Sequence, residues 1–284
     1  PTDNDAHSPL VLGKQNWFTK QYDHPKRTCL EVRQGNGVEE PSLTYTTAYQ
    51  TEKDSFYVTV GLWQAGQNRI FIDCNVQSPA DMLSPGRIGM TAILPVRFTA
   101  MKWYGKGPLE TYPDRQCGGR MGVYSEDVRN QPFYLRPQEY GLHTESRSMR
   151  LTDPDRADFV RFEAACPMAM SAVPYSDLQL WNARHPPELP APEALYVHLD
   201  YTHRGLGNSS CGPDVLPTYR IDDRPCRFGF ALEAGLGERE DNPFGPIPEE
   251  IPAYHPWKAV GEQDRTPSYR DPSDPDQRSN AGMV

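Results

Sequence analysis

The chain lacks long apolar runs and a recognisable leader. No segment approaches the roughly 20 apolar residues that a membrane-spanning helix needs, so such a span is not expected. The first residues, Pro1 to Asp5, are polar and carry neither an initiator methionine nor a secretory signal. From these absences we expect a cytoplasmic protein, and a chain that is a fragment or a processed product.

Basic residues are also in short supply. The 29 Lys and Arg residues face 38 Asp and Glu residues, which gives a net charge of −9. A general nucleic-acid binder is disfavoured, because its affinity depends on neutralising phosphates with Lys and Arg.

Cysteine pairs with metal-site spacing are absent too, because no C-x-x-C occurs. We therefore expect isolated thiols, with disulfides or a zinc site as the alternatives. The six cysteines are Cys29, Cys74, Cys117, Cys166, Cys211 and Cys226.

Helical periodicity is weak, whereas the 29 Pro and 22 Gly make up about 18% of the chain, well above average usage. Alternating apolar residues predict short strands at 43–48, 55–62, 69–76, 87–98, 159–164, 195–201 and 227–231. Within 69–76, Ile70, Ile72 and Cys74 share one face, and Pro95 marks a bulge or an edge. The best helix candidate is 176–182, with Ser176 as N-cap. These patterns predict an all-β fold of two antiparallel sheets packed face to face.

The composition changes near residue 237. Residues 237–284 hold eight Pro, ten acidic and five basic residues, and no strand pattern. Such a segment cannot repay its ordering entropy alone. We therefore predict a sandwich domain at 1–236 and a partly disordered, Pro- and acid-rich extension at 237–284. Apolar residues could anchor the first half of the extension on a neighbour; they are Phe244, Ile247, Ile251, Tyr254 and Trp257.

Three segments are dense in aromatic, Gly and Pro residues. The first, 103–115 (WYGKGPLETYPDR), predicts a rigid loop with a local Asp114–Arg115 ion pair. A surface that packs on another domain, or an aromatic platform for a sugar ring, remains an alternative.

The second segment is 132–145 (PFYLRPQEYGLHTE). A buried Arg136–Glu139 pair is expected there, because a buried carboxylate is costly unless it is paired. Alternatively, Glu139 is a catalytic acid that works with Glu110 or Glu145, which requires a raised pKa.

The third segment, 203–214 (HRGLGNSSCGPD), follows a predicted strand and is a loop shaped by glycines. A phosphate cradle is disfavoured because Pro213 and Pro217 prevent a helix from following directly. A nucleophilic Cys211 served by His203 or His198 is a further alternative.

At these segments the sequence resembles the C-terminal domain of glycoside hydrolase family 2 β-galactosidases, which is also the small chain of two-subunit enzymes. The resemblance covers about residues 1–235. Its matching stretches are PTDND at 1–5, WYGKGPLETYPDR at 103–115, MGVY at 121–124, RPQEYGLHTE at 136–145 and LDYTHRGLGNSSCGPDVLPTYR at 199–220.

The resemblance implies a large antiparallel supersandwich related to galactose mutarotases. It also implies that both catalytic glutamates lie on a barrel domain that this chain lacks, so that the chain alone has no catalytic residues. Its partner would be the barrel-bearing large chain or the preceding domains, and the substrate a β-galactoside such as lactose. Cofactors are not expected in this chain, because the Mg and Na ions of intact family enzymes lie mostly outside this region.

The resemblance also suggests substrate-binding residues. In many family members the loop equivalent to 205–212 presents a Trp to the sugar, and Cys211 holds that position here. Cys211 and Asn208 are therefore the candidate lining of the sugar site, on the aglycone side; a purely structural loop is the alternative. Whether another aromatic, such as Trp257, replaces the missing ring stays open.

Two other functions are compatible with these residues. One is a stand-alone carbohydrate-binding module on a mutarotase-like sandwich. The other is a sugar epimerase, which needs a general acid and base, typically a His and a Glu facing one cleft. For that activity the core candidates are His143, His198 and His203.

Overall fold

Antiparallel strands dominate the part of the chain that the computed structural model describes, residues 21–237 without 23, 53, 80–82, 136–137, 208–213 and 222–224. They include every strand that the alternating patches predict. In chain order the strands are β1 (Lys26–Gln34), β2 (Leu43–Gln50), β3 (Ser55–Gln64), β4 (Arg69–Gln77), β5 (Arg87–Pro95), β6 (Ala100–Gly107), β7 (Arg120–Asp127), β8 (His143–Thr152), β9 (Phe159–Val173), β10 (Ala194–His203) and β11 (Cys226–Gly235).

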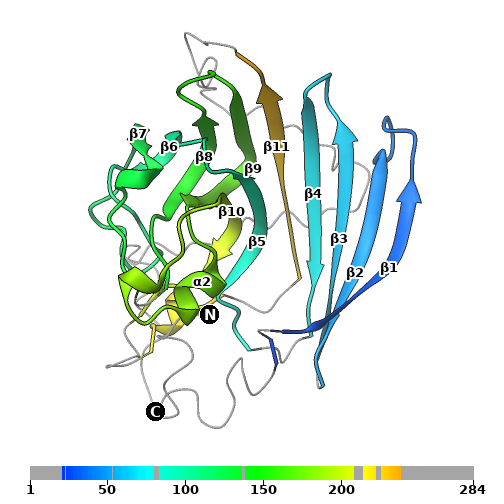
Figure 1. The fold of residues 1–284 in the computed structure, drawn as a ribbon. Helices are drawn as coiled ribbons and strands as arrows, with labels where there is room; N and C mark the ends of the chain where they lie inside the picture. The colour runs from blue at the N-terminus through cyan, green and yellow to red at the C-terminus, as the bar shows by residue number, and fades with distance from the viewer. Residues whose placement is uncertain are drawn as a thin grey trace, which may run out of the picture.

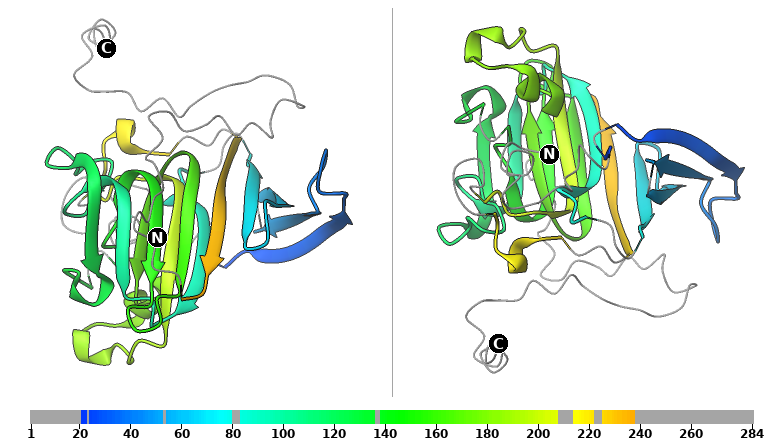
Figure 2. Two further views of the ribbon diagram at one scale, coloured as in Figure 1. Left: turned by 90° about the horizontal axis from the view of Figure 1, so that it is seen from above. Right: turned by 90° about the horizontal axis from the view of Figure 1, so that it is seen from below.

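The strands form two layers (Figures 1 and 2). The larger layer has the order β1-β2-β3-β4-β11-β9-β8-β6-β7, while β10 pairs with β5 and with β9. β9 takes part in both layers, because its first half pairs with β11 and its second half with β10. Among the described strands β5 pairs only with β10, and it ends at Pro95, so the edge alternative of the bulge or edge predicted for that proline is confirmed. The predicted all-β sandwich is thus confirmed.

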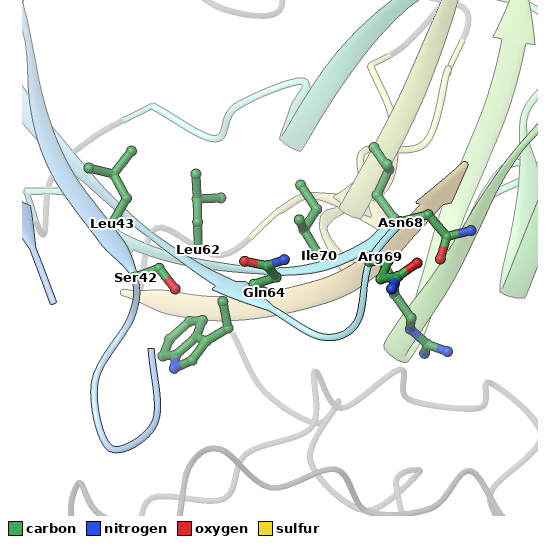
Figure 3. Close-up of a pocket in the computed structure, with 10 residues that line it drawn as sticks. Ser42, Leu43, Leu62, Gln64, Asn68, Arg69 and Ile70 are labelled. Carbon is green, nitrogen blue, oxygen red and sulfur yellow. The ribbon is translucent and has the colours of Figure 1, made fainter. Parts of the chain in front are cut away.

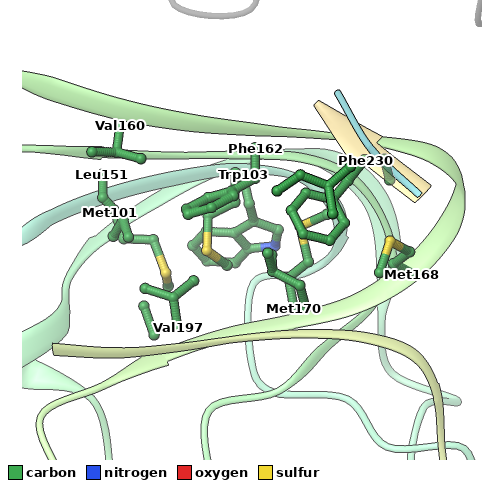
Figure 4. Packing of buried hydrophobic residues seen from close by; sticks show 14 of the residues in the cluster. Met101, Trp103, Leu151, Val160, Phe162, Met168, Met170, Val197 and Phe230 are labelled. Carbon is green, nitrogen blue, oxygen red and sulfur yellow. The ribbon is translucent and has the colours of Figure 1, made fainter. Parts of the chain in front are cut away.

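One main core fills the space between the layers (Figure 4). The larger layer contributes Trp103 and Phe162, and the smaller contributes Val197 and Met170, all at most 1% exposed. Ile70, Ile72 and Cys74 face this core together, as the alternation in 69–76 predicts.

The helix at 176–182 is confirmed as α2 (Asp177–Asn182), a short helix in front of β5 and β10 in Figure 1. The Ser176 hydroxyl accepts the Gln179 N–H at 3.2 Å, and the Gln179 side chain accepts the Ser176 N–H at 2.8 Å. This capping box satisfies backbone donors that a helix start leaves free. Three 3₁₀ turns complete the described helical structure: η1 (Val128–Asn130), η2 (Pro186–Glu188) and η3 (Pro217–Tyr219).

The prediction of a loop throughout 103–115 is wrong for its first half, which lies in β6. The glycines there permit close packing rather than turning. A Cβ on Gly105 would lie 2.6 Å from the Ser146 hydroxyl, and one on Gly107 would lie 2.6 Å from the Tyr124 ring. Strands β1, β7 and β8 were also not predicted, because polar residues interrupt their alternation.

Some of the predicted features lie outside the residues that the structure describes. Cys29, Cys74, Cys117, Cys166 and Cys226 are free thiols, whereas Cys211 lies outside that part. The extension predicted at 237–284 also lies outside it, apart from Gly237. No helix in the described ranges has the length and apolar character that crossing a membrane demands.

Candidate functional site

The three conspicuous segments meet at one corner of the fold, beside the outer face of β10. Glu110 accepts the Gly141 N–H at 2.7 Å, and Thr111 donates its N–H to the Leu142 carbonyl at 2.6 Å. Tyr112 packs in a small apolar cluster with Leu142 and with Leu206, which follows β10. Segments distant in sequence therefore build one structure.

A group of charged side chains lies inside this corner. The Arg87 guanidinium, at the start of β5, donates to Glu139 at 2.8 Å and to Asp177 of α2 at 3.2 Å. Its other terminal nitrogen lies 3.7 Å from Asp200 Oδ2. Glu139 and Asp200 are 5% and 1% exposed, so Arg87 compensates two carboxyl groups that have almost no access to water.

Two histidines extend this group. His203 Nε2 lies 3.7 Å from Glu139 Oε2, and His203 Nδ1 contacts the Arg204 carbonyl oxygen at 2.5 Å. His198 Nε2 lies 3.6 Å from Asp177 Oδ1. The Tyr112 hydroxyl donates to Glu139 Oε1 at 3.2 Å. We call Arg87, Tyr112, Glu139, Asp177, His198, Asp200 and His203 the charged cluster.

Burial and mutual charges set the protonation states in the charged cluster. Burial opposes ionisation of Glu139, but Arg87 and His203 outweigh it and hold its pKa well below the usual value. Burial raises the pKa of Asp200 to about 7, although Arg87 and His203 act against it. Burial and Arg87 lower the pKa of His198 to about 4. Burial also disfavours the cationic form of His203, but Glu139 raises its pKa overall.

The base of the loop after β10 is fixed at both ends. At one end, Asp114 accepts the Leu206 N–H at 3.0 Å and the Gly207 N–H at 2.7 Å. At the other, Asp214 binds Arg204 at 2.5 Å and Arg220 at 2.9 Å. Residues 207 and 214 are therefore held firmly. We call these contacts the loop base.

Glycine is required at the first end. A Cβ on Gly205 would lie 2.7 Å from Asp114 Cγ and from Val215 Cγ2, and Gly207 has a φ of +58°. Both positions disfavour larger residues. The predicted Asp114–Arg115 pair is wrong, because Asp114 serves the loop base while Arg115 contacts Glu110 and Tyr134.

The structure describes some of the predicted site residues but not others. Asn208 and Cys211 lie outside the described residues, as does Arg136. Glu139 is paired, as expected for a buried acid. The partner that the structure shows is Arg87 of β5, and the predicted partner was Arg136. The raised pKa that a catalytic Glu139 requires is contradicted, because its pKa is lowered.

The structure also separates the three candidate histidines. His198 and His203 join the charged cluster, whereas His143 stacks on Trp103 with ring centroids 3.9 Å apart. For the epimerase alternative, the structure shows that Arg87 and Tyr112 donate to the two Glu139 oxygens.

Sequence reasoning missed Arg87, Asp177 and Asp200 as members of the site. One signal was present: in 195–201 (LYVHLDY), His198 and Asp200 stand at alternate positions between apolar residues. Such a pattern usually indicates a solvent-facing side. Here Asp177 of α2 faces His198, and Arg87 links Asp200 to Glu139, which only the tertiary structure reveals.

The described part of this region assembles no set of metal ligands. Among the described residues, no group of three or more His, Cys, Asp and Glu side chains could hold a metal ion. The acidic oxygens of the charged cluster instead face Arg87 and the histidines.

The sequence of the chain is similar to those of known proteins. Residues 1–232 match the family described as "Beta galactosidase small chain". A β-galactosidase of Staphylococcus xylosus is 27% identical over 82% of this chain and 23% of its own length. The β-galactosidase BgaC of Bifidobacterium adolescentis is 30% identical over 82% of this chain and 22% of its own length. The chain thus spans less than a quarter of these relatives.

A solved structure gives a distant likeness in addition. It is a putative aldose 1-epimerase from Escherichia coli, 10% identical, with a TM-score of 0.38 over 74% of this chain and 69% of that one. Nothing further depends on this likeness. The family match, in contrast, covers almost the whole sandwich. The chain belongs to the β-galactosidase small-chain family.

Proposed function

We propose that this chain is the small subunit or C-terminal domain of a family 2 β-galactosidase, and that it completes the active-site wall and the assembly for hydrolysis of terminal β-D-galactosides. The family match and the relatives named β-galactosidase support the enzyme class. Within the enzyme, the loop at 207–214 reaches the sugar site, with Asn208 and Cys211 on the aglycone side.

The observation that carries this proposal is the loop base. Asp114 and Asp214 hold residues 207 and 214 through four contacts with backbone N–H groups and arginines. A short loop with fixed ends can present its side chains at a defined place, which substrate positioning requires. The loop base is tied to the sandwich through Arg204, which directly follows β10.

The chain alone does not hydrolyse galactosides in this proposal. Retaining hydrolysis needs two carboxyl groups about 5–5.5 Å apart, one of them protonated as the acid. Glu139 is instead a paired anion, and Glu110 and Glu145 are engaged with Arg115 and Arg147. The catalytic carboxyl groups, and the Mg and Na ions of the intact enzyme, then belong to the barrel-bearing part.

The test is reconstitution with a separately produced large chain. The pure 284-residue chain should cleave no o-nitrophenyl galactoside, and mixing it with the large chain should restore cleavage. Galactose binding by the chain alone at micromolar strength would instead favour a carbohydrate-binding module. Turnover by the chain alone would overturn the proposed division of roles.

The loop can be tested in the same assay. Cys211→Trp places an aromatic ring where many family members carry one, and stacking under a sugar adds apolar contact. The reconstituted variant should have a lower KM for the galactoside, whereas Cys211→Ser should leave KM nearly unchanged. Equal KM values for the tryptophan and serine variants would place Cys211 away from the sugar.

A further inference from the structure

The core-facing side of the larger layer is not fully covered by the smaller layer. Figure 2 shows β1, β2 and β3 projecting beyond β5 and β10. In this uncovered part a groove of about 440 Å³ opens between β2, β3, β4 and β11 (Figure 3). Leu43, Leu62, Ile70 and Leu232 line it, and the last three also pack against the main core. The groove therefore continues the core to the surface.

The same uncovered face extends onto β1. Val32 pairs directly with Tyr45, so the two side chains lie on one side of the sheet. Tyr45 packs against the core, whereas Val32 is 62% exposed. We call Val32, Leu43, Tyr45, Leu62, Ile70 and Leu232 the open face. Five of its six residues are half-buried and Val32 is exposed, so the open face offers a small apolar contact area at the surface.

The free edge of β1 is a less suitable contact. The register shifts between Cys29 and Glu31, and charged residues such as Lys26 and Arg33 stand along the strand. Bulges and charges protect an edge strand against pairing with another strand. A partner is therefore expected on the open face rather than along the edge.

The length of the relatives indicates which partner occupies the open face. The chain spans only 21–23% of relatives such as those of Staphylococcus xylosus and Priestia megaterium, so most of such an enzyme lies outside it. The last described residue, Gly237, donates its N–H to Asp158, beside the start of β9.

We propose that the open face is the docking surface for the part of the β-galactosidase that this chain lacks, which inserts apolar side chains into the groove. This inference rests on the proposed function and specifies where the partner binds. α2 and β10, which carry part of the charged cluster, lie apart from β1–β3 in Figures 1 and 2, so docking at the open face leaves that corner accessible.

The experiment compares two matched glutamate substitutions in the full chain. Val32→Glu places a carboxylate on the open face, and Ile93→Glu places one on β5, where the isoleucine is 66% exposed. Both positions are exposed and β-branched, so neither substitution should impair folding. The affinity for the separately produced large chain and the molar mass in solution are measured for each variant.

We expect Val32→Glu to weaken binding of the large chain by about tenfold or more, because an unpaired carboxylate is desolvated on docking. Ile93→Glu should leave the affinity unchanged. Equal affinities for both variants would overturn the docking surface while leaving the proposed function intact. Failure of the unmodified chain to bind would overturn the proposed function itself. Self-association that Val32→Glu abolishes would assign the open face to a second copy and overturn the inference.

Discussion

Asp114 and Gly207 are joined by a hydrogen bond of 2.7 Å although 93 positions separate them in the chain. The same carboxylate accepts the neighbouring Leu206 N–H, so one side chain fixes two consecutive backbone groups. The turn at 108–119 and the loop after β10 are thereby locked together. This contact links the first conspicuous sequence segment to the third.

Replacing Asp114 should loosen the loop base. In Asp114→Asn the amide can accept one N–H but not both, which leaves a backbone donor without a partner. We expect a loss of about 1–3 kcal/mol in the free energy of unfolding, measured by urea denaturation. Asp155→Asn, at an exposed position, is the control and should change stability little. Equal effects for the two variants would contradict a special role for Asp114.

The close packing at Gly205 gives a second prediction. In Gly205→Ala the new Cβ meets Asp114 and Val215 at 2.7 Å, whereas a Cβ on Gly118 meets nothing within 4 Å. Gly205→Ala should therefore destabilise the chain by about 1–3 kcal/mol, as overpacking does. Gly118→Ala should be neutral or slightly stabilising. The readout is the midpoint of thermal or urea unfolding.

The Arg87–Glu139 pair gives a third prediction. Glu139→Gln leaves the Arg87 cation without its closest buried partner, and breaking such a pair typically costs about 3–5 kcal/mol. The double variant Arg87→Met with Glu139→Leu should lose less stability than the sum of the losses in Arg87→Met alone and in Glu139→Leu alone. Urea unfolding of all four proteins in a double-mutant cycle measures this coupling. Additive losses would show that the two side chains do not interact.

Asp200 predicts a pH dependence of stability. Burial raises its pKa from the ordinary value of 3.8 to about 7, so the folded chain holds a proton that the unfolded chain releases. This contribution is fully present below about pH 4, declines as the pH rises, and is lost above about pH 7.

The variant Asp200→Asn isolates this effect, because the amide does not titrate. Its unfolding free energy minus that of the unmodified chain should increase from about pH 4 to about pH 7 by on the order of 2–4 kcal/mol, and then stay level. The comparison is needed because His198, with its pKa lowered to about 4, has the opposite trend: its contribution is lost as the pH falls through that range. A pH-independent difference would contradict the burial of a titrating Asp200.

The thiols offer a rapid check of the burial pattern. Cys29 and Cys117 are exposed, whereas burial raises the pKa of Cys74 to about 12 and that of Cys226 to about 11. Because the thiolate is the reactive form, a disulfide reagent at neutral pH should modify Cys29 and Cys117 first among the five described thiols. Mass spectrometry of the partly labelled chain identifies them. Early labelling of Cys74 would contradict its place in the core.

The sequence by itself determined the fold class and the identity of the strands with clear alternation. Side chains point to opposite faces of a strand by turns, so a patch such as 69–76 carries its core face in the sequence. The N-cap at Ser176 is likewise a local preference, because its hydroxyl binds a backbone group three residues away. The long motifs also sufficed to predict the family.

Only the tertiary structure decided which polar side chains meet. Arg87, Glu139, Asp177 and Asp200 come from four separate segments, and the cost of burying charge selects their pairing only after the layers and the cap have formed. The projection of β1–β3 beyond the smaller layer could not be predicted from the sequence either, because alternation shows that one side of a strand is apolar but not which element covers it.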